Sequence, residues 1–277
     1  MKKSLLIILI TLLSFVFTFG AACSVDSPVE PLPSTPAPPS TPTPPTTGEE
    51  NANLWDVSDT DISHIGKNRR LIAFTFDDGP TEKTKDLLDA FEAFNAKNPD
   101  FIAHATLFTI GSKITAGNAP LLERAVSMKF ELGNHTFTHT NLTTISDEKV
   151  KEELRLTDEK LKNADGKSVH LVRPAGGHAD SRVLSLYKTT FINWTAALDT
   201  KDFDDSVTEN DVYDTVLSNL LDGGIVLMHQ GYDKSVAAVK RLLPDLKALG
   251  YQVVSVSELI RYYGVKAEIG KLYNSFI

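Results

Sequence analysis

Two adjacent carboxylates, Asp77 and Asp78, follow an apolar run and come directly before Gly79-Pro80. The run 71–76 is typical of a β-strand, and the Gly-Pro pair indicates a turn. Successive side chains of a regular strand point to opposite faces, so the two carboxylates can share a site only where the strand breaks. Active sites of α/β folds lie at strand ends. We therefore expect one carboxylate to bind a metal ion and its neighbour to act as a base; the alternative is an exposed acidic turn.

Two histidines, His135 and His139, are separated by four positions and follow a short strand that ends at Asn134. On a strand this separation spans ~13 Å, too far for both to bind one ion through bonds of ~2.1 Å. On a helical turn, positions i and i+4 share a face, so the spacing predicts a turn of helix or a tight loop. Two imidazoles with one carboxylate leave a coordination position open, which is the pattern of a catalytic zinc-like site. A coincidental spacing is the alternative.

Arg173 and Gly176 lie in a third stretch, Arg-Pro-Ala-Gly-Gly, again at a predicted strand end. An arginine can bind a carboxylate through two parallel hydrogen bonds and hold a base in place. The glycines allow main-chain N–H groups to approach a ligand closely and to hold an oxyanion. A structural arginine before a turn is the alternative interpretation.

Two further stretches are Trp194 through Asp202-Phe203, and a buried-type strand that contains Leu227 and ends at His229. A histidine at a strand end is suited to acid–base work when a carboxylate partner sets its pKa. The alternative is a core histidine that caps the strand.

The alternation of elements predicts an α/β fold with parallel pairing and right-handed crossovers. About 210 residues suit a single barrel-like domain. Ser146 and Thr208 are predicted helix caps. The predicted strands are 71–76, 105–110, 131–134, 169–173, 191–194, 224–229 and 251–255, and the predicted helices are 82–95, 119–128, 147–164, 180–188, 210–221, 235–249 and 257–263.

The first 53 residues differ in composition from the rest. Residues 1–22 have the basic start, apolar centre and small residues of a signal peptide. Cys23 follows at once, which resembles a bacterial lipoprotein signal and predicts lipidation; simple secretion is the alternative. Residues 23–53 are a linker rich in Pro, Ser and Thr that should run extended. The catalytic domain is predicted over 54–277.

The overall composition restricts the partners and the stabilising chemistry. Of the 277 residues, 42% are hydrophobic and 23% are charged, which is typical of a globular protein. The net charge of -8 argues against a nucleic-acid partner. The single cysteine excludes an intrachain disulfide and a cysteine-based zinc cage.

Together, the five stretches resemble the polysaccharide deacetylases of carbohydrate esterase family four, the NodB-homology domain. The most specific are Thr-Phe-Asp-Asp-Gly-Pro at 75–80 and His135 with His139, and all five occur in the family's order across residues 70–263. The resemblance implies a distorted (β/α) barrel with fewer than eight repeats, which agrees with the seven predicted strands.

The resemblance also implies a role for each position. The implied metal ligands are Asp78, His135 and His139, and the ion would be Zn²⁺, with Co²⁺ as the alternative. Asp77 would activate water and Arg173 would orient it, while the N–H of Gly176 would hold the oxyanion. His229, paired with Asp202, would protonate the leaving group, and Leu227 would line the pocket for the acetyl methyl. Four other histidines, His64, His104, His170 and His178, match no family role and are expected to be structural or to lie on the surface.

The chain departs from the family pattern at three positions. Ala175 and Gly176 replace a proline and an aromatic residue, and Phe203 replaces a tryptophan, which removes an indole donor. No catalytic group is lost, so activity is expected, but the sugar specificity is open.

We therefore predict an exported metal-dependent deacetylase that acts on a carbohydrate polymer, with the N-acetyl groups of peptidoglycan as the first candidate substrate. Chitin oligomers and acetylated xylan are alternatives within the class. A non-catalytic glycan-binding module of the same fold and a phosphoesterase are the rivals from other classes. We expect a monomer, secreted or held at the outer face of the cell membrane by the N-terminal lipid.

Overall fold

The computed structural model describes residues 56–276. The predicted signal peptide, the linker and Cys23 lie outside these residues. Within 56–276, no helix has the length and apolar character needed to cross a membrane.

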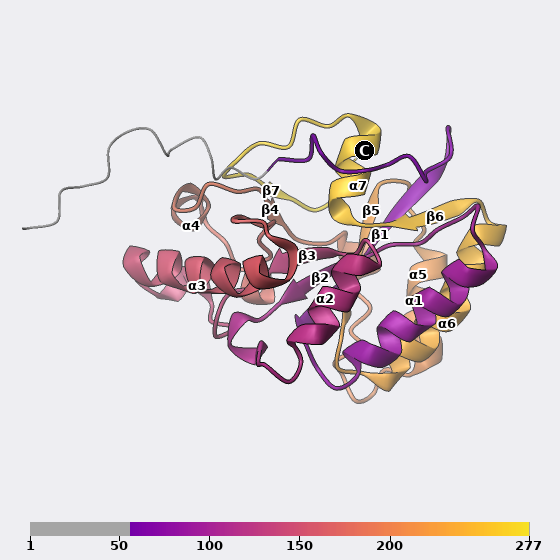
Figure 1. Cartoon of the computed structure of the whole chain (residues 1–277), viewed down its shortest axis with the longest axis horizontal. Coiled ribbons are helices and arrows are strands. Elements are labelled where there is room, and N and C mark those ends of the chain that lie inside the picture. The colour runs from indigo at the N-terminus through magenta and orange to yellow at the C-terminus, as the bar shows by residue number, and fades with distance from the viewer. Residues whose placement is uncertain (1–55, 277) are drawn as a thin grey trace, which may run out of the picture. The chain divides into compact units, whose positions relative to one another are not determined.

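Strand β1 (Arg70–Gly79) is the centre of the sheet (Figure 1). On one side it pairs with β5 (Gly224–His229). On the other side it pairs first with β6 (Tyr251–Val254) and then with β2 (Thr106–Thr109). Strand β3 (Glu131–Asn134) continues the sheet beyond β2. Every one of these pairings is parallel, as the alternation of elements predicted.

The remaining strands bend the sheet toward a barrel without closing it. Strand β4 (Phe191–Ile192) pairs with β7 (Leu272–Tyr273). Val172 alone bridges β3 to β4, so the strand predicted at 169–173 was wrong in length. Arg173, the next residue, has its guanidinium hydrogen-bonded at the end of β1. Strand β7 was not predicted, because two residues carry no alternating pattern.

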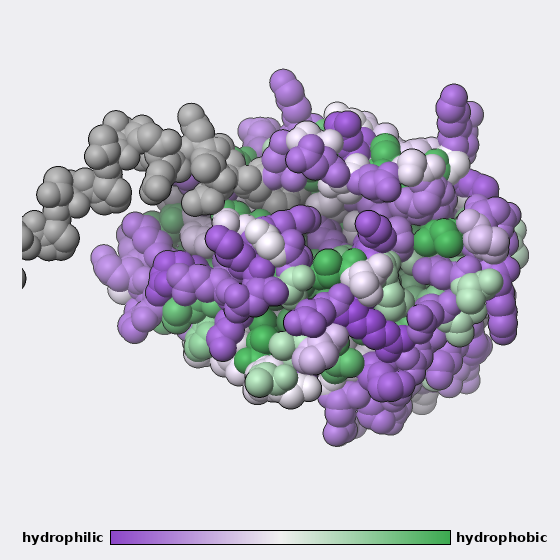
Figure 2. Space-filling model, viewed as in Figure 1, coloured by the Kyte–Doolittle hydropathy of each residue, from purple (hydrophilic) through white to green (hydrophobic). Residues whose placement is uncertain are grey.

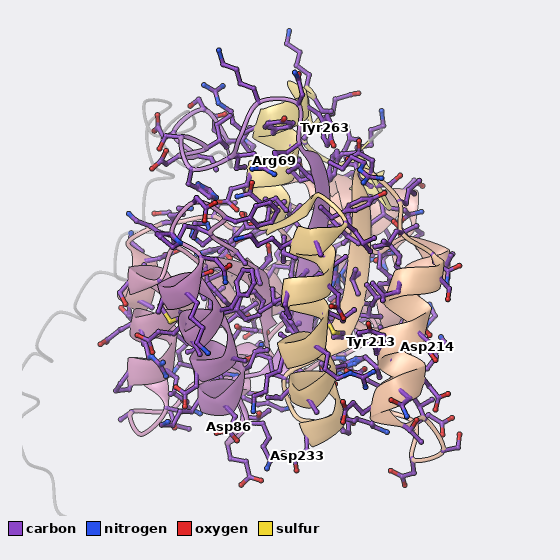
Figure 3. All side chains as sticks on the ribbon, turned by 90° about the vertical axis from the view of Figure 1, so that its right-hand side faces the viewer. Arg69, Asp86, Tyr213, Asp214, Asp233 and Tyr263 are labelled. Atoms are coloured by element: carbon purple, nitrogen blue, oxygen red, sulfur yellow. The ribbon has the colours of Figure 1, made fainter. Side chains whose placement is uncertain are left out.

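Helices surround the sheet (Figure 1). In Figure 1, α1, α5 and α6 lie together at one end, and Tyr213 on α5 donates a 2.6 Å hydrogen bond to Asp245 on α6 (Figure 3). Ser146 and Thr208 both accept a hydrogen bond from the first turn of their helices, so the predicted caps are confirmed. The predicted helix 180–188 is shorter in the structure. The helices are α1 (Thr84–Lys97), α2 (Ala119–Ser127), α3 (Asp147–Asp165), α4 (Ser181–Ser185), α5 (Glu209–Ser218), α6 (Asp233–Ala248) and α7 (Val256–Tyr263).

The core consists of the strands and the apolar sides of these helices. Phe76 of β1 packs edge-on against Phe91 of α1, which packs in turn against Phe130 before β3. The surface in Figure 2 is mainly hydrophilic with small apolar areas. Among residues 56–276 the exposed large hydrophobic side chains are Phe203, Leu249 and Ile269. The core thus fixes the strand ends from which the candidate site is built.

Candidate active site

Strand β1 becomes irregular at its two carboxylates. Its register with β2 shifts between Phe76 and Gly79, and Asp78 has a positive φ of 68°. The break lets both neighbouring side chains reach His135: Asp77 Oδ2 lies 3.6 Å and Asp78 Oδ1 lies 3.4 Å from its Nε2 atom. The expectation that the strand breaks here is confirmed.

Gln230, which follows β5, holds this break in place. Its backbone N–H donates to Asp77 O at 3.0 Å, and its side-chain Oε1 accepts from Thr84 Oγ1 of α1 at 2.9 Å. A Cβ atom added to Gly79 would lie only 1.9 Å from that Oε1 atom. The glycine is therefore required by the close approach of Gln230.

The histidines lie in a tight loop after β3, which was one of the two predicted conformations. Thr136 and His139 both have positive φ angles, 65° and 61°. Glu153 of α3 anchors the loop by accepting hydrogen bonds from the N–H groups of Phe137 and Thr138, both at 2.8 Å. The rings of His135 and His139 consequently lie 4.9 Å apart between their centroids.

The proton on His135 is placed by its neighbour. Its Nδ1 atom lies 2.7 Å from Arg173 O. A carbonyl oxygen can only accept, so Nδ1 carries a proton, and Nε2 is the nitrogen that can offer a lone pair when the ring is neutral. Nε2 faces Asp78 Oδ1, which is buried and has no hydrogen-bond partner within 56–276. With the ring neutral, these two acceptors have no proton between them and fit a cation.

The distances also suit a metal ion. Asp78 Oδ1 lies 3.4 Å from His135 Nε2 and 3.3 Å from His139 Nε2. The edge of a ligand tetrahedron with metal bonds of 2.0–2.1 Å is about 3.3–3.4 Å. His139 is 42% exposed at its side chain, so the cluster is open on one side.

The electrostatics favour ligand forms of these groups. Burial raises the pKa of Asp78, but the imidazoles of His135, His139 and His229 in their protonated forms outweigh it and hold the pKa below its usual range, so the carboxylate is ionised before any metal ion binds. Burial, and then the neighbouring His135, lowers the pKa of His139 and favours the neutral ring. An ionised carboxylate and a neutral imidazole are the forms that bind metals.

Asp77 has a different environment, because it is paired with Arg173. The fully buried guanidinium donates from Nη1 to Asp77 Oδ1 and to Thr75 Oγ1, each at 2.7 Å. Its Nη2 donates to Asn193 O at 2.8 Å, and the group lies 4.1 Å over the Phe108 ring. Arg173 therefore fixes one oxygen of Asp77 and leaves the other facing His135.

His229, at the end of β5, forms a second acid–base pair with Asp202. Its Nδ1 lies 2.6 Å from Asp202 Oδ1, and Oδ2 accepts from the His229 N–H at 2.7 Å and from Ser235 Oγ. Burial lowers the pKa of His229, but Asp202 outweighs it, so the pKa is raised above the ordinary histidine value. In the sheet, His229 is directly opposite Asp77.

The two remaining predicted residues lie on elements that border this site. Gly176 has a φ of 62° in a turn whose hydrogen bonds start from Gly177 N and His178 N, so its own N–H takes part in neither. Leu227 is 4% exposed and is paired with Thr75, two positions before the Asp77–His229 pair.

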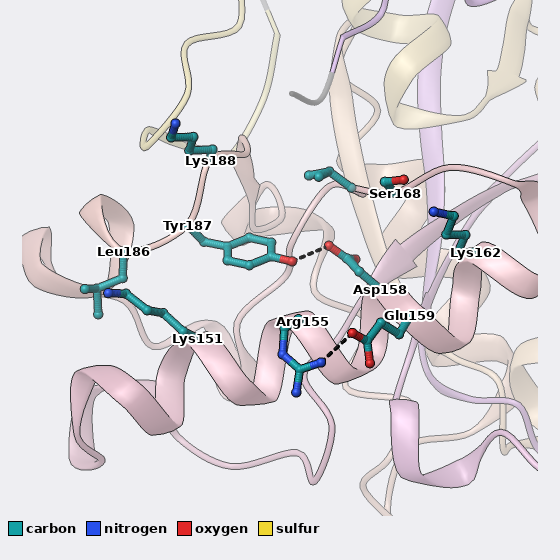
Figure 4. Close-up of a pocket in the computed structure, with 10 residues that line it drawn as sticks. Lys151, Arg155, Asp158, Glu159, Lys162, Ser168, Leu186, Tyr187 and Lys188 are labelled. Atoms are coloured by element: carbon teal, nitrogen blue, oxygen red, sulfur yellow. Dashed lines mark hydrogen bonds and ion pairs between the residues drawn. The ribbon is translucent and has the colours of Figure 1, made fainter. Parts of the chain in front are cut away.

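A buried network supports the histidine loop from behind. Asn134 accepts from the Thr136 N–H at 3.0 Å and donates to Asp158 Oδ1 at 2.8 Å. Asp158 also accepts from Tyr187 at 2.7 Å (Figure 4) and from His170 Nδ1 at 2.9 Å. His170 is thus confirmed as structural.

Several supporting residues were missed by sequence reasoning: Thr75, Lys113, Glu153, Gln230 and Ser235. Thr75 lies inside the first motif and could have been found there. The others reach the site through long-range contacts that leave no local pattern.

Several known proteins with a similar sequence or fold are named for acting on carbohydrates. Residues 64–192 match the family profile described as polysaccharide deacetylase. A peptidoglycan-N-acetylglucosamine deacetylase of Bacillus cereus is 33% identical over 72% of this chain and 92% of its own length. A bifunctional xylanase/deacetylase of Pseudobutyrivibrio xylanivorans is 32% identical over 73% of this chain, which spans only 32% of that protein.

A solved structure shows the same fold. A family 4 acetyl xylan esterase from Clostridium thermocellum, in complex with a cobalt ion, has a TM-score of 0.68 and 25% identity. The alignment covers 74% of this chain and 98% of the esterase.

Proposed function

Because the chain belongs to the polysaccharide deacetylase family, we propose that it is a metal-dependent hydrolase that removes acetyl groups from a carbohydrate polymer. The observation that carries this proposal is the cluster of Asp78, His135 and His139. Beside it lie Asp77 and His229, each held by its own ion-pair partner. Asp77 is held by Arg173, and His229 is held by Asp202.

We assign the metal to Asp78, His135 and His139. When bound, the ion supplies a Lewis acid and lowers the pKa of water. Zn²⁺ is our first assignment because the ligand distances match its tetrahedral geometry. Co²⁺ is the alternative, and it is the ion held by the Clostridium esterase.

The chain's own groups divide the remaining chemistry. Asp77 takes a proton from the attacking water, and the hydrogen bond from Arg173 orients its carboxylate. The Gly176 N–H is unused by its own turn and binds the developing oxyanion. His229, held protonated by Asp202, donates its proton to the leaving nitrogen or oxygen, and Leu227 contacts the acetyl methyl.

For the substrate we propose the N-acetyl groups of peptidoglycan amino sugars. The Bacillus relative that the chain covers almost entirely is named for that activity. The predicted signal peptide, lipidated Cys23 and extended linker would place the domain at residues 54–277 outside the membrane, within reach of the wall. We expect it to act there as a monomer.

Acetylated xylan is the second candidate, because the esterase carries that substrate in its name and the Pseudobutyrivibrio relative is named a xylanase/deacetylase. A non-catalytic glycan-binding module is less well supported, since each group that the reaction needs is present.

The test is acetate release from peptidoglycan, chitin oligomers and acetylated xylan by the purified protein, with added Zn²⁺ or Co²⁺ and with chelator. Chelator-sensitive acetate from peptidoglycan supports the proposal. Acetate from xylan alone would make acetylated xylan the substrate in place of peptidoglycan. Acetate from none of the three would favour the binding module.

A further inference from the structure

We infer that the chain has a second divalent-metal site, formed by His64, His104 and Glu258. The three residues come from distant segments: His64 precedes β1, His104 precedes β2, and Glu258 lies in the first turn of α7. They meet where β6 ends and β2 begins, because His104 N donates to Val253 O of β6. Val253 is paired with Ile72, five positions before Asp77, so the cluster is roughly 16 Å along the strand from the candidate active site.

The ligand atoms already converge on one carboxylate oxygen. Glu258 Oε1 lies 2.6 Å from His104 Nδ1 and 3.6 Å from His64 Nε2. The two rings are 4.4 Å apart between centroids, and one ligand atom from each of the three residues lies within 4.8 Å of the others. Within residues 56–276, His135, His139 and Asp78 form the other cluster of this kind.

An unsatisfied nitrogen shows that the cluster lacks a partner. His64 Nε2 is buried and makes no hydrogen bond within the described part of the chain. A buried polar atom without a partner is costly.

Glu258 is anchored in a way that leaves Oε1 for the ion. Its Oε2 accepts from the Ser255 N–H at 2.8 Å, within the capping box that starts α7. The 2.6 Å contact to His104 is a hydrogen bond, so an ion would replace that proton and separate the two atoms to about 3.3 Å. This small opening is the rearrangement that binding requires.

The surroundings are negative and have room for water. The cluster lines a cavity of about 290 Å³. The carboxylates that line it are Asp59, Asp61, Glu131, Asp165 and Glu258, against the ammonium groups of Lys129 and Lys167. The excess of carboxylates attracts a cation, and water or a neighbouring carboxylate completes four-coordination. Bound there, the ion ties the segment before β1 to β2 and α7.

The experiment measures zinc per chain by elemental mass spectrometry after equilibration of the full-length protein with Zn²⁺ and removal of excess. Variants at both clusters separate the sites: His64→Gln for the inferred site, His139→Gln for the candidate active site, and the double variant. His178→Gln makes the same change at an exposed histidine outside both clusters.

We expect about two zinc ions per chain in the wild type and in His178→Gln, about one in each single variant, and none in the double variant. In the His139→Gln background, Zn²⁺ should also raise the midpoint of thermal unfolding, and His64→Gln should abolish that rise. If His64→Gln fails to fold, one remaining zinc in His139→Gln still supports the inference.

About one zinc in the wild type, lost in His139→Gln and kept in His64→Gln, would overturn the inference. A second ion that persists in His64→Gln would also overturn it, since it would lie elsewhere. None of these outcomes depends on acetate release, so this site can fail while the proposed function stands.

Discussion

Asp77 and Asp78 carry the same side chain but have opposite environments. Asp77 is bound by a buried arginine, whereas the inner oxygen of Asp78 is left without a hydrogen-bond donor beside two imidazoles. The one-residue break in β1 creates this difference. At the scale of single residues, these contacts are the basis on which we propose Asp77 as the base and Asp78 as a metal ligand.

Replacing Asp77 with asparagine should remove the base and keep the metal. We expect kcat to fall by about 10²–10⁴-fold, the range for loss of a general base, while zinc content stays at the wild-type level. Acetate release and elemental analysis measure the two quantities. Asp86→Asn is the matched control: Asp86 is an exposed carboxylate on α1 (Figure 3), and its replacement should leave kcat unchanged. Loss of zinc together with activity would instead make Asp77 a metal ligand.

The pH profile of kcat should report on His229. Its raised pKa keeps the acid form populated above the ordinary histidine value, so activity falls as the pH rises through that raised pKa. Asp202→Asn removes the group that raises the pKa, and the alkaline limb should therefore move to lower pH. Asp205→Asn is the control, because Asp205 is exposed and lies three positions after Asp202, and its alkaline limb should not move. An alkaline limb at the same pH in Asp202→Asn would contradict the assigned acid.

At the scale of elements, strand ends are placed by contacts from other parts of the chain. The end of β1 is held by Gln230 after β5. The histidine loop after β3 is held by Glu153 of α3 and by the buried hydrogen-bond network that includes Asp158. The sequence predicted which strand ends meet, because parallel strands align their carboxyl ends. It could not predict the holding residues, since each one acts across a long sequence separation.

Gly79→Ala should destabilise the protein, because the new methyl group would collide with the Gln230 side chain. We expect the free energy of unfolding to fall by about 1–3 kcal/mol, typical of overpacking. Gly117→Ala is the control, because its nearest neighbour would lie 3.9 Å away. Chemical denaturation measures both. Equal stability of the two variants would show that Gln230 moves aside without cost.

His170 should make stability depend on pH in the alkaline range. Burial lowers its pKa, but Asp158 and Asp165 outweigh it and raise the pKa to about 9. Because the folded-state pKa is raised, the stabilisation is complete below about pH 6.5 and is lost as the pH rises through about 9. The stability difference between wild type and His170→Gln should therefore shrink over that interval in denaturation experiments. His178→Gln is the control, and a difference that stays constant with pH would contradict a charged His170.

At the scale of the whole molecule, residues 56–276 form a five-stranded parallel sheet that single-residue bridges extend to the β4–β7 pair, with the candidate site residues at neighbouring strand ends. The sequence predicted this class, since alternating apolar runs and amphipathic stretches leave few arrangements. It overestimated the strand at 169–173 and missed β7, because bridges of one or two residues depend on neighbouring strands. Lipidation and the linker remain predictions for residues 1–53.

The most direct test of the central claim is the rate of acetate release from peptidoglycan by one preparation, first stripped of metal and then restored with Zn²⁺. We predict that stripping abolishes release, that Zn²⁺ restores it in the wild type, and that His135→Gln neither binds this zinc nor regains activity. Acetate release that survives metal removal, or that zinc restores in His135→Gln, would contradict a hydrolase built on Asp78, His135 and His139.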